Sequence, residues 1–280
     1  MAQDTSEVPN WDDLGSDDIS ESELAESQEL VRIGQDKDLQ ALPRVLLGVK
    51  SPCQEVRVSA ADTLAKIGDS AIVDSERALI SLLSDPDAPV RYSAIAALGV
   101  LGCKSTVPKI IEFLQDPQYM IRVAAAESLG YLEDPVAVPH LLKVLADRNQ
   151  VVRTFAACSI GLLATSADTP ELRESIRNAE RVESDVVVRM ELLIAGYRLG
   201  EPGSKDRMRE VLFVQPGLSK ETALQVLNGL VFFVEYAPPP SLRQDREFFA
   251  GIVREIGAKV LGPDDWGHAE IQHILSVLTS

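Results

Sequence analysis

Long apolar runs are missing from this 280-residue chain, which nowhere has the 18 consecutive hydrophobic residues of a membrane-spanning helix. Its first residues, MAQDTSEVPNWDD, contain neither the basic segment nor the apolar stretch of a secretory signal. Cysteine is scarce, with three residues and no Cys-x-x-Cys pair, which argues against a disulfide framework and is typical of a reducing compartment. We therefore expect a cytoplasmic protein without membrane insertion.

Positive charge is also in short supply. The chain has 27 Lys and Arg residues against 43 Asp and Glu residues, which gives a formal net charge of −16. No stripe of basic residues interrupts this negative charge, which would repel a phosphate backbone. We expect no nucleic-acid partner, and a protein partner with basic character would be attracted.

Residues suited to catalysis are few. None of the three histidines is followed by Glu, and no Gly-rich phosphate loop, nucleophile elbow or pair of catalytic carboxylates occurs. His268 and His273 are five residues apart, which does not place them on one helical face as metal ligands. The sequence therefore predicts no catalytic residue, no metal site and no cofactor.

What the chain does contain is a repeated phrase. It reads VRVSAADTLAKIG from Val56, VRYSAIAALGVLG from Val90, IRVAAAESLGYLE from Ile121, VRTFAACSIGLLA from Val152 and VRMELLIAGYRLG from Val188. Successive arginines of the phrase are 34, 31, 31 and 36 residues apart. Self-similarity at such a period predicts a solenoid of stacked units.

Prolines mark a second landmark in the units. Pro43, Pro108 and Pro139 each lie 14 residues before an arginine of the phrase, within LPRVLL, VPKIIEFL and VPHLLKVL. Because proline is tolerated in the first turn of a helix, these residues predict the starts of first helices. Turns such as DPDAP and DPQYM follow, and the phrase itself then forms the second helix. Each unit is predicted to be a helical hairpin.

An Asp-Pro turn followed by V-R-x-x-A-x-x-A-L-G-x-L-G resembles HEAT repeats of the phycobilisome-lyase-like subclass, over residues 37–200. The resemblance implies an all-α fold, a right-handed α–α superhelix of the HEAT/armadillo type with about six helical hairpins. Proteins of this class include bilin lyase subunits, iron–sulfur assembly helpers, a di-iron hydroxylase and protein-binding scaffolds, so the fold does not select a function. The hydroxylase needs His-Glu pairs, which this chain lacks.

The chain is predicted to have four parts. Residues 1–19 form an acidic disordered tail, residues 20–36 a capping helix with Leu24 and Leu30 turned inward, residues 37–200 five HEAT-like repeats, and residues 201–280 a divergent helical repeat and cap. Residues 1–30 hold ten acidic side chains and no Lys or Arg. Trp11 and Leu14 lie among them, and the tail is either a docking motif or a solubilising segment.

A helical wheel separates two sides of the second helices. The predicted core side of the first two units holds Val56, Ala60, Leu64, Ile67, Val90, Ala94, Leu98 and Leu101. The other side is expected to line a concave surface, where the candidate partner-binding residues are Tyr92, Val100, Val123, Glu127, Tyr131, Phe155 and Leu162. Asp62 and Lys66 lie there in the first unit, so we expect a groove that is apolar in its middle and charged toward its end. Packing between repeats is the alternative explanation for the same apolar residues.

The regular arginines are interpreted as structural. They are Arg57, Arg91, Arg122, Arg153 and Arg189, and the last four follow a turn that contains Asp. This pattern predicts a ladder of charge-assisted hydrogen bonds that orders successive turns. Gly99, Gly130 and Gly161 recur at one position of the second helices and predict close helix approach.

The function that these observations favour is a non-catalytic adapter that binds a helix or extended segment of a protein partner. The resemblance leaves open a bilin lyase-like or chaperone subunit that acts on phycobiliprotein-like helical proteins. A weaker alternative is iron–sulfur or metal delivery through Cys53, Cys103 or Cys158.

Overall fold

The computed structural model describes residues 19–68, 72–164, 166–214, 218–235, 238–239, 241–261 and 267–279. These residues form fifteen α-helices and no strand, which confirms the predicted all-α helical-repeat fold. None of the described helices combines the length and the hydrophobicity needed to cross a bilayer. The chain divides into two compact units, residues 1–159 and 160–280, and each is described by itself.

The first unit begins with helix α1 (Glu21–Asp36), where a cap helix was expected. Ser20 forms a capping box with Glu23, because the Ser20 side chain accepts from the Glu23 amide while the Glu23 carboxylate accepts from the Ser20 amide. Leu30 is fully buried, whereas Leu24 is 45% exposed, so the prediction that both leucines turn inward was wrong for Leu24. Leu24 lies nearly two turns closer to the exposed helix start.

Helical hairpins follow in the order that the repeats predict. The first helices are α2 (Leu42–Gly48), α4 (Ile72–Leu82), α6 (Val107–Glu112) and α8 (Val138–Val144). The second helices are α3 (Gln54–Ile67), α5 (Ala88–Val100), α7 (Tyr119–Tyr131) and α9 (Gln150–Leu163). Short 3₁₀ turns are η3 (Leu39–Ala41), η5 (Lys104–Thr106), η6 (Phe113–Gln115) and η7 (Pro135–Ala137). Pro43, Pro108 and Pro139 lie in the first turns of α2, α6 and α8, as predicted.

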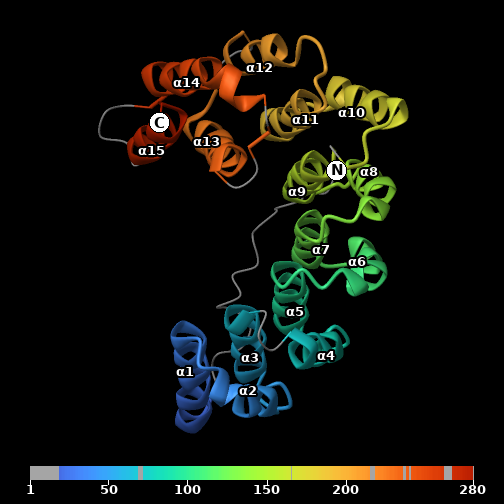
Figure 1. Cartoon of the computed structure of the whole chain (residues 1–280), viewed down its shortest axis with the longest axis vertical. Helices are drawn as coiled ribbons and strands as arrows, with labels where there is room; N and C mark the ends of the chain where they lie inside the picture. Colours follow the sequence, from blue (N-terminus) through green and yellow to red (C-terminus); the bar gives the residue numbers. More distant parts are fainter. Residues whose placement is uncertain are drawn as a thin grey trace, which may run out of the picture. The chain divides into compact units, whose positions relative to one another are not determined.

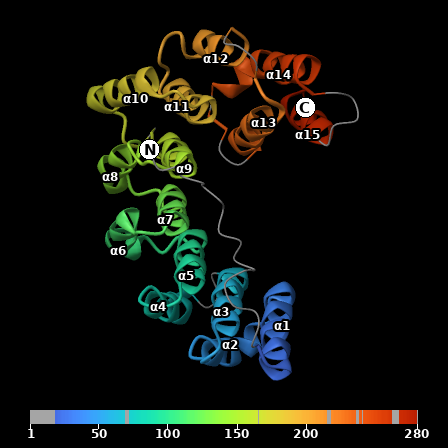
Figure 2. The ribbon, with the colours of Figure 1, turned by 180° about the vertical axis from the view of Figure 1, so that it is seen from behind.

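These helices form two layers within the first unit. Helices α1, α3, α5 and α7 pack side by side in chain order, and α2, α4 and α6 each pack against the second helix of their own hairpin (Figures 1 and 2). The core lies between the layers. All eight core residues predicted from the wheel are buried, with Ile67 and Leu101 the most exposed at 6%.

The regular arginines join each repeat to the next one. Arg57 makes a bidentate contact with Asp85, with N–O distances of 2.8 and 3.0 Å, and Arg122 does the same with Asp147 at 2.7 and 2.9 Å. Arg91 lies 4.0 Å from Asp116. In each case the acceptor belongs to the turn of the following repeat, not to the turn that precedes the arginine.

Each arginine also binds the turn before its own helix. The Arg91 guanidinium donates to the carbonyl of Asp85, the Arg122 guanidinium to that of Asp116, and the Arg153 guanidinium to that of Asp147, at 2.9 to 3.1 Å. The three aspartates thus contact two arginines each, one through the carboxylate and one through the carbonyl. This arrangement, here called the Arg–Asp ladder, ties every turn to two repeats.

The pattern changes at the fifth repeat. Arg189 contacts Glu180 of its own hairpin at 2.7 Å, and Asp185 caps its own helix by accepting from the amides of Val187 and Val188. The contact of Arg189 with Glu180 therefore differs from the contacts of the Arg–Asp ladder, which is described here from Arg57 to Asp147.

Hydroxyl groups form a second link between neighbouring second helices. Thr63 donates to the carbonyl of Leu30 at 2.8 Å, Ser128 to that of Ile95 at 3.0 Å and Ser159 to that of Ala126 at 2.8 Å. Each acceptor lies 33 residues earlier in the chain. Such hydrogen bonds from a short side chain to a backbone carbonyl require that the neighbouring helices of this layer lie close together.

Gly99 illustrates this closeness. A methyl group added at Gly99 would lie 2.7 Å from the Ser128 side chain and 2.9 Å from its Cα, so only glycine fits at this point of α5. At Gly161 the nearest atoms, those of Ala195, are 3.6 Å away or farther, so close approach does not explain this glycine.

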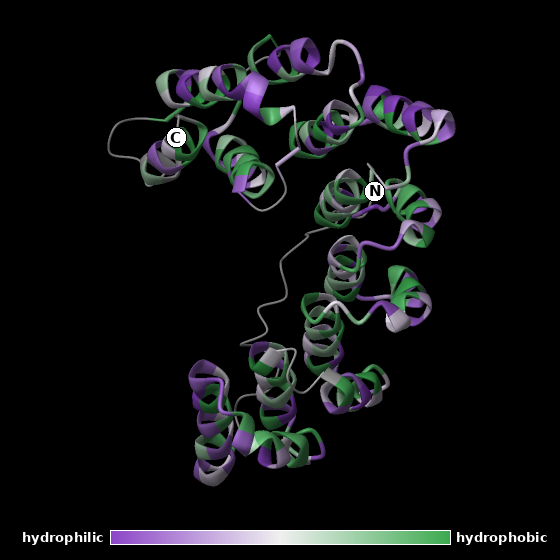
Figure 3. Cartoon of the chain, in the orientation of Figure 1, coloured by the Kyte–Doolittle hydropathy of each residue, from purple (hydrophilic) through white to green (hydrophobic). Residues whose placement is uncertain are grey.

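The second unit holds the last helical hairpins and the C-terminal helices. They are α10 (Pro170–Val182), α11 (Val186–Arg198), α12 (Ser204–Phe213), α13 (Lys220–Glu235), α14 (Leu242–Lys259) and α15 (Gly267–Thr279). Tyr197, Phe233 and Phe249 pack together in its core in edge-to-face and tilted arrangements, with the Phe249 ring centroid 5.3 Å from that of Tyr197 and 5.1 Å from that of Phe233. Helix α10 is largely hydrophilic and buries Leu172 and Ile176 (Figure 3).

Candidate functional site

The candidate site is the surface of α3, α5 and α7 that lies opposite the core side of these helices, here called the second-helix face. Its most exposed apolar residues are Val100, at 65%, and Tyr131, at 40%, which are the last residues of α5 and α7. Tyr92 and Glu127 are half-buried. The face thus combines accessible apolar surface with partly shielded polar groups.

Asp62 of α3 provides the first charge of the second-helix face. The residue is exposed, yet the surrounding protein partly desolvates its carboxyl group and thereby raises its pKa, because burial disfavours the charged form. A hydrogen bond with Ser93 of α5 and the charge of Lys66 act in the opposite direction.

Glu127 of α7 provides the second charge. Burial raises the pKa of its carboxyl group, while a hydrogen bond donated by the Tyr131 hydroxyl, at 3.3 Å, partly opposes this. Tyr92 belongs to α5, which packs between α3 and α7, and burial first and then the charges of Glu127 and Asp62 raise the pKa of its hydroxyl group. The two acids and the tyrosine thus lie on three successive helices of one layer.

Some residues predicted for this surface are elsewhere. Val123 is only 4% exposed, so the prediction that it is available to a partner was wrong. Helix α7 has α5 on one side, α9 on the other, as the Ser159–Ala126 hydrogen bond shows, and α6 behind it. Phe155 is half-buried on α9, and Leu162 belongs to the second unit. Trp11 and Leu14 lie outside the described residues.

The middle of the second-helix face is also more polar than expected. The sequence indicated an apolar groove, but Ser93 and Ala124, assigned to it from the wheel, are 7% and 1% exposed. What remains accessible around Tyr92 includes the carboxylates. Asp62 and Glu127 occupy the same position, five residues after the arginine of their repeats, and this shared acidity was the signal that the sequence offered.

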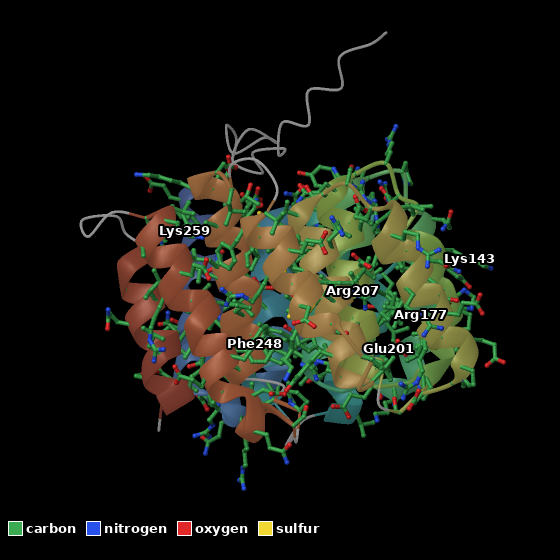
Figure 4. The ribbon with its side chains drawn as sticks, turned by 90° about the horizontal axis from the view of Figure 1, so that it is seen from above. Lys143, Arg177, Glu201, Arg207, Phe248 and Lys259 are labelled. Atoms are coloured by element: carbon green, nitrogen blue, oxygen red, sulfur yellow. The ribbon has the colours of Figure 1, made fainter. Side chains whose placement is uncertain are left out.

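Several shielded carboxylates elsewhere in the chain are paired with arginine. Asp85 and Asp147 belong to the Arg–Asp ladder. In the second unit, Glu201 contacts Arg177 at 3.0 Å, and the two lie close together in Figure 4. In contrast, neither Asp62 nor Glu127 makes an ion pair with any of the residues that the structure describes.

Two of the three cysteines, Cys53 and Cys103, are poor candidates for metal delivery. Cys103 is buried, and burial raises the pKa of its thiol to about 11. Burial also raises the pKa of the Cys53 thiol, so both favour the protonated form, which is not a metal ligand. Within the described ranges, no three His, Cys, Asp or Glu side chains come together in a way that could hold a metal ion.

A cavity of about 560 Å³ in the second unit is lined by residues of the α11–α12 turn and the start of α14. Its carboxylate Asp245 already accepts from Tyr197 at 2.9 Å and from Lys205 at 2.6 Å. This cavity therefore contains a carboxylate that has an ion pair, whereas the second-helix face offers carboxylates without one.

Comparison with known proteins addresses the fold. A family model described as HEAT repeats matches residues 76–161. A chain in the complex of CpcE and CpcF of phycocyanin lyase from Nostoc sp. PCC7120 has a TM-score of 0.54 and 22% identity, covering 84% of this chain and 93% of that one. YibA of Escherichia coli has a TM-score of 0.51 and 17% identity, covering 95% of this chain and 99% of that one.

No curated protein matches the sequence. At these identities the likeness to the two solved structures is one of fold. Residues 76–161, which reach from α4 into α9, therefore match HEAT repeats, and the described part of the chain has a helical-repeat fold like that of the two solved structures.

Proposed function

We propose that the protein is a non-catalytic scaffold that binds a protein partner on its second-helix face. The observation that carries this proposal is the exposure of Val100 and Tyr131 at the ends of adjacent helices, beside Tyr92 and Glu127. Exposed apolar side chains framed by polar groups are common at protein-binding sites, and tyrosine is a frequent anchor. Each apolar side chain that a partner covers contributes about 1 to 2 kcal/mol.

The test compares two double variants by affinity purification followed by identification of the bound proteins. In the face variant, Val100→Glu is combined with Tyr131→Glu. In the control, Leu47→Glu is combined with Val136→Glu, at apolar positions that are 70% and 60% exposed but lie off the second-helix face. We expect the face variant to lose its partner and the control to retain it, with unchanged helical circular dichroism in both. Retention by the face variant, or loss by both, would contradict the proposal.

A lyase-like or chaperone role is the second candidate, and the likeness in fold to the phycocyanin lyase chain motivates it. It is tested by co-expression with a phycobiliprotein-type helical subunit and a bilin supply. A scaffold leaves the subunit without covalently bound pigment. A visible absorbance band that stays with the subunit after denaturation would favour the lyase-like role instead.

A further inference from the structure

We propose that Arg189 and Arg207 form a binding site for a carboxylate group that comes from outside the described helices. The site belongs to the second unit, where α10 and α12 both pack against α11. Since the second-helix face belongs to the first unit, the inference goes beyond the proposed scaffold function and does not depend on it.

The Arg–Asp ladder shows what an arginine at this repeat position holds elsewhere. Arg57 donates from Nε and Nη2 to the two carboxylate oxygens of Asp85. Arg122 binds Asp147 with the same two atoms. Each aspartate comes from the turn of the following repeat. This edge of the guanidinium group therefore matches a carboxylate through two parallel hydrogen bonds.

The repeat after Arg189 supplies no such acid. Its helices α12 and α13 are joined by residues 214–219, which read VQPGLS and include no Asp or Glu. Arg189 donates instead from Nη2 to Glu180 of its own hairpin at 2.7 Å, and its Nε atom is buried without a hydrogen-bond partner in the described chain. One of the two hydrogen bonds of a bidentate ladder contact is therefore missing at Arg189.

Arg207 of α12, labelled in Figure 4, brings a second cation to the same carboxylate. Its Nη1 atom lies 3.6 Å from Oε2 of Glu180, beyond hydrogen-bond distance, and its Nε atom is also buried without a partner among the described residues. Two guanidinium groups thus share one carboxylate, whose side chain is 7% exposed. The cluster has an excess of positive charge and two buried N–H donors without an acceptor, which is energetically costly.

The acidic side chains nearest to Arg189 in sequence are held by backbone amides. Asp185 accepts from two amides of α11, and Glu183 accepts from two amides of the turn before it. Asp206, which precedes Arg207 on α12, is exposed. The described part of the fold therefore supplies no carboxylate to the two Nε atoms.

A carboxylate suits the donors that remain. The Arg189 side chain is 21% exposed and that of Arg207 33%, so a ligand can reach both guanidinium groups from solvent. Because the Nε atoms are covered, binding requires the two side chains to rotate toward the ligand. A carboxylate that accepts from both Nε–H groups would complete the ladder geometry at Arg189 and balance the excess charge.

Two sources carry such a group. One is a small free carboxylic acid. The other is an acidic protein segment such as residues 1–18 of this chain, which hold six acidic side chains and no Lys or Arg. The ligand chemistry is the same in both cases, and the experiment distinguishes the sources.

The experiment follows the arginine Nε–H signals of the full ¹⁵N-labelled chain by NMR, assigned with Arg189→Lys and Arg207→Lys. Burial slows exchange with water, so these two signals should persist at neutral pH. Succinate is titrated at constant ionic strength into wild type and into a segment variant, in which the six acids of residues 1–18 are changed to Asn or Gln. We expect both signals to move when a carboxylate binds. A shift on adding succinate to wild type identifies a free acid as the ligand, whereas a shift between wild type and the segment variant before any succinate is added identifies the segment.

Affinity for succinate, measured in the segment variant, is the second readout. Adding Arg207→Gln should weaken binding about tenfold, whereas Arg181→Gln, which removes the same charge from an exposed position of α10, should change it by less than about twofold. Helical circular dichroism checks that both variants fold, and if Arg207→Gln does not, the signals of wild type and the segment variant decide.

Two results would overturn this inference. One is that both Nε–H signals stay in place in every comparison. The other is that Arg181→Gln weakens binding as much as Arg207→Gln, which would mean diffuse attraction of anions to a basic surface. Neither result affects the scaffold function, because its test concerns Val100 and Tyr131 of the first unit.

Discussion

Replacing Glu191 with glutamine is expected to change how the stability of the second unit depends on pH. Glu191 lies on α11 and is 7% exposed. A methyl group at Gly229 of α13 would collide with its Oε1 atom, so the carboxyl group is pressed against the neighbouring helix. Burial raises the pKa of Glu191 to about 7, although the charge of Arg198, two turns along the same helix, opposes the shift.

The magnitude follows from linkage between proton binding and folding. The folded state binds the proton more tightly than the unfolded state, whose pKa is near the ordinary 4.5, so stability is greatest below pH 4.5 and is lost as the pH rises toward 7. The raised pKa of Glu191 lowers the free energy of unfolding by about 1 kcal/mol at pH 5 and about 3 kcal/mol at pH 8. Wild type should therefore lose about 2 kcal/mol relative to Glu191→Gln between these pH values.

Urea unfolding at pH 5, 6, 7 and 8 measures this difference, and hydrogen exchange of the α11 amides assigns it to the second unit. The matched control is Glu174→Gln, which removes an exposed carboxylate from α10 and should follow wild type at every pH. Parallel stability curves for wild type and Glu191→Gln would refute the reasoning. So would a ¹³C titration that places the Glu191 carboxyl group near 4.5.

Three further outcomes are expected. Asp147→Asn keeps the bond from the turn amide but loses the bidentate contact with Arg122, so its free energy of unfolding in urea should fall by about 2 to 3 kcal/mol. Asp116→Asn is the comparison: its arginine is 4.0 Å away, so the loss should be about 1 kcal/mol or less. Gly99→Ala should destabilise the fold by about 1 to 2 kcal/mol through overpacking. Gly161→Ala should be neutral or should stabilise the fold by up to about 1 kcal/mol. If Gly161→Ala is the more destabilising of the two, helix spacing is not the constraint. Iodoacetamide at pH 8 should modify buried Cys103 last of the three cysteines by mass spectrometry, and rapid labelling would contradict its raised pKa.

Local rules were enough to predict much of the fold. Proline placed the starts of α2, α6 and α8, and the 3.6-residue period identified core residues such as Val56 and Leu98, because both signals depend on the chain within a few residues. The partner of each ladder arginine could not be found in this way. An Asp that precedes an arginine in sequence is the nearer candidate, but stacking brings the Asp of the following repeat to the guanidinium.

The candidate site was harder to predict for a related reason. A wheel divides a helix into two sides, yet a helix within a layer has two lateral neighbours, and these bury Val123 and Ser93. The wheel also contains no information on desolvation, so it grouped Tyr92 with apolar residues and did not reveal that Asp62 and Glu127 act on its hydroxyl group. These effects arise only when three repeats are placed side by side.

The Arg–Asp ladder gives the stack a polarity. The carboxylate of Asp85 accepts from the repeat before it, while its carbonyl accepts from its own repeat. A cut between two repeats therefore leaves unequal ends. The earlier fragment keeps an arginine whose guanidinium has lost its carboxylate partner. The later fragment keeps a turn whose aspartate still accepts from a backbone amide of the same turn, as Asp85 accepts from the Asp87 amide. A new hairpin with one such arginine and one such aspartate could be inserted at a junction between Arg57 and Asp147, which makes duplication of whole repeats a simple way for a chain of this kind to lengthen.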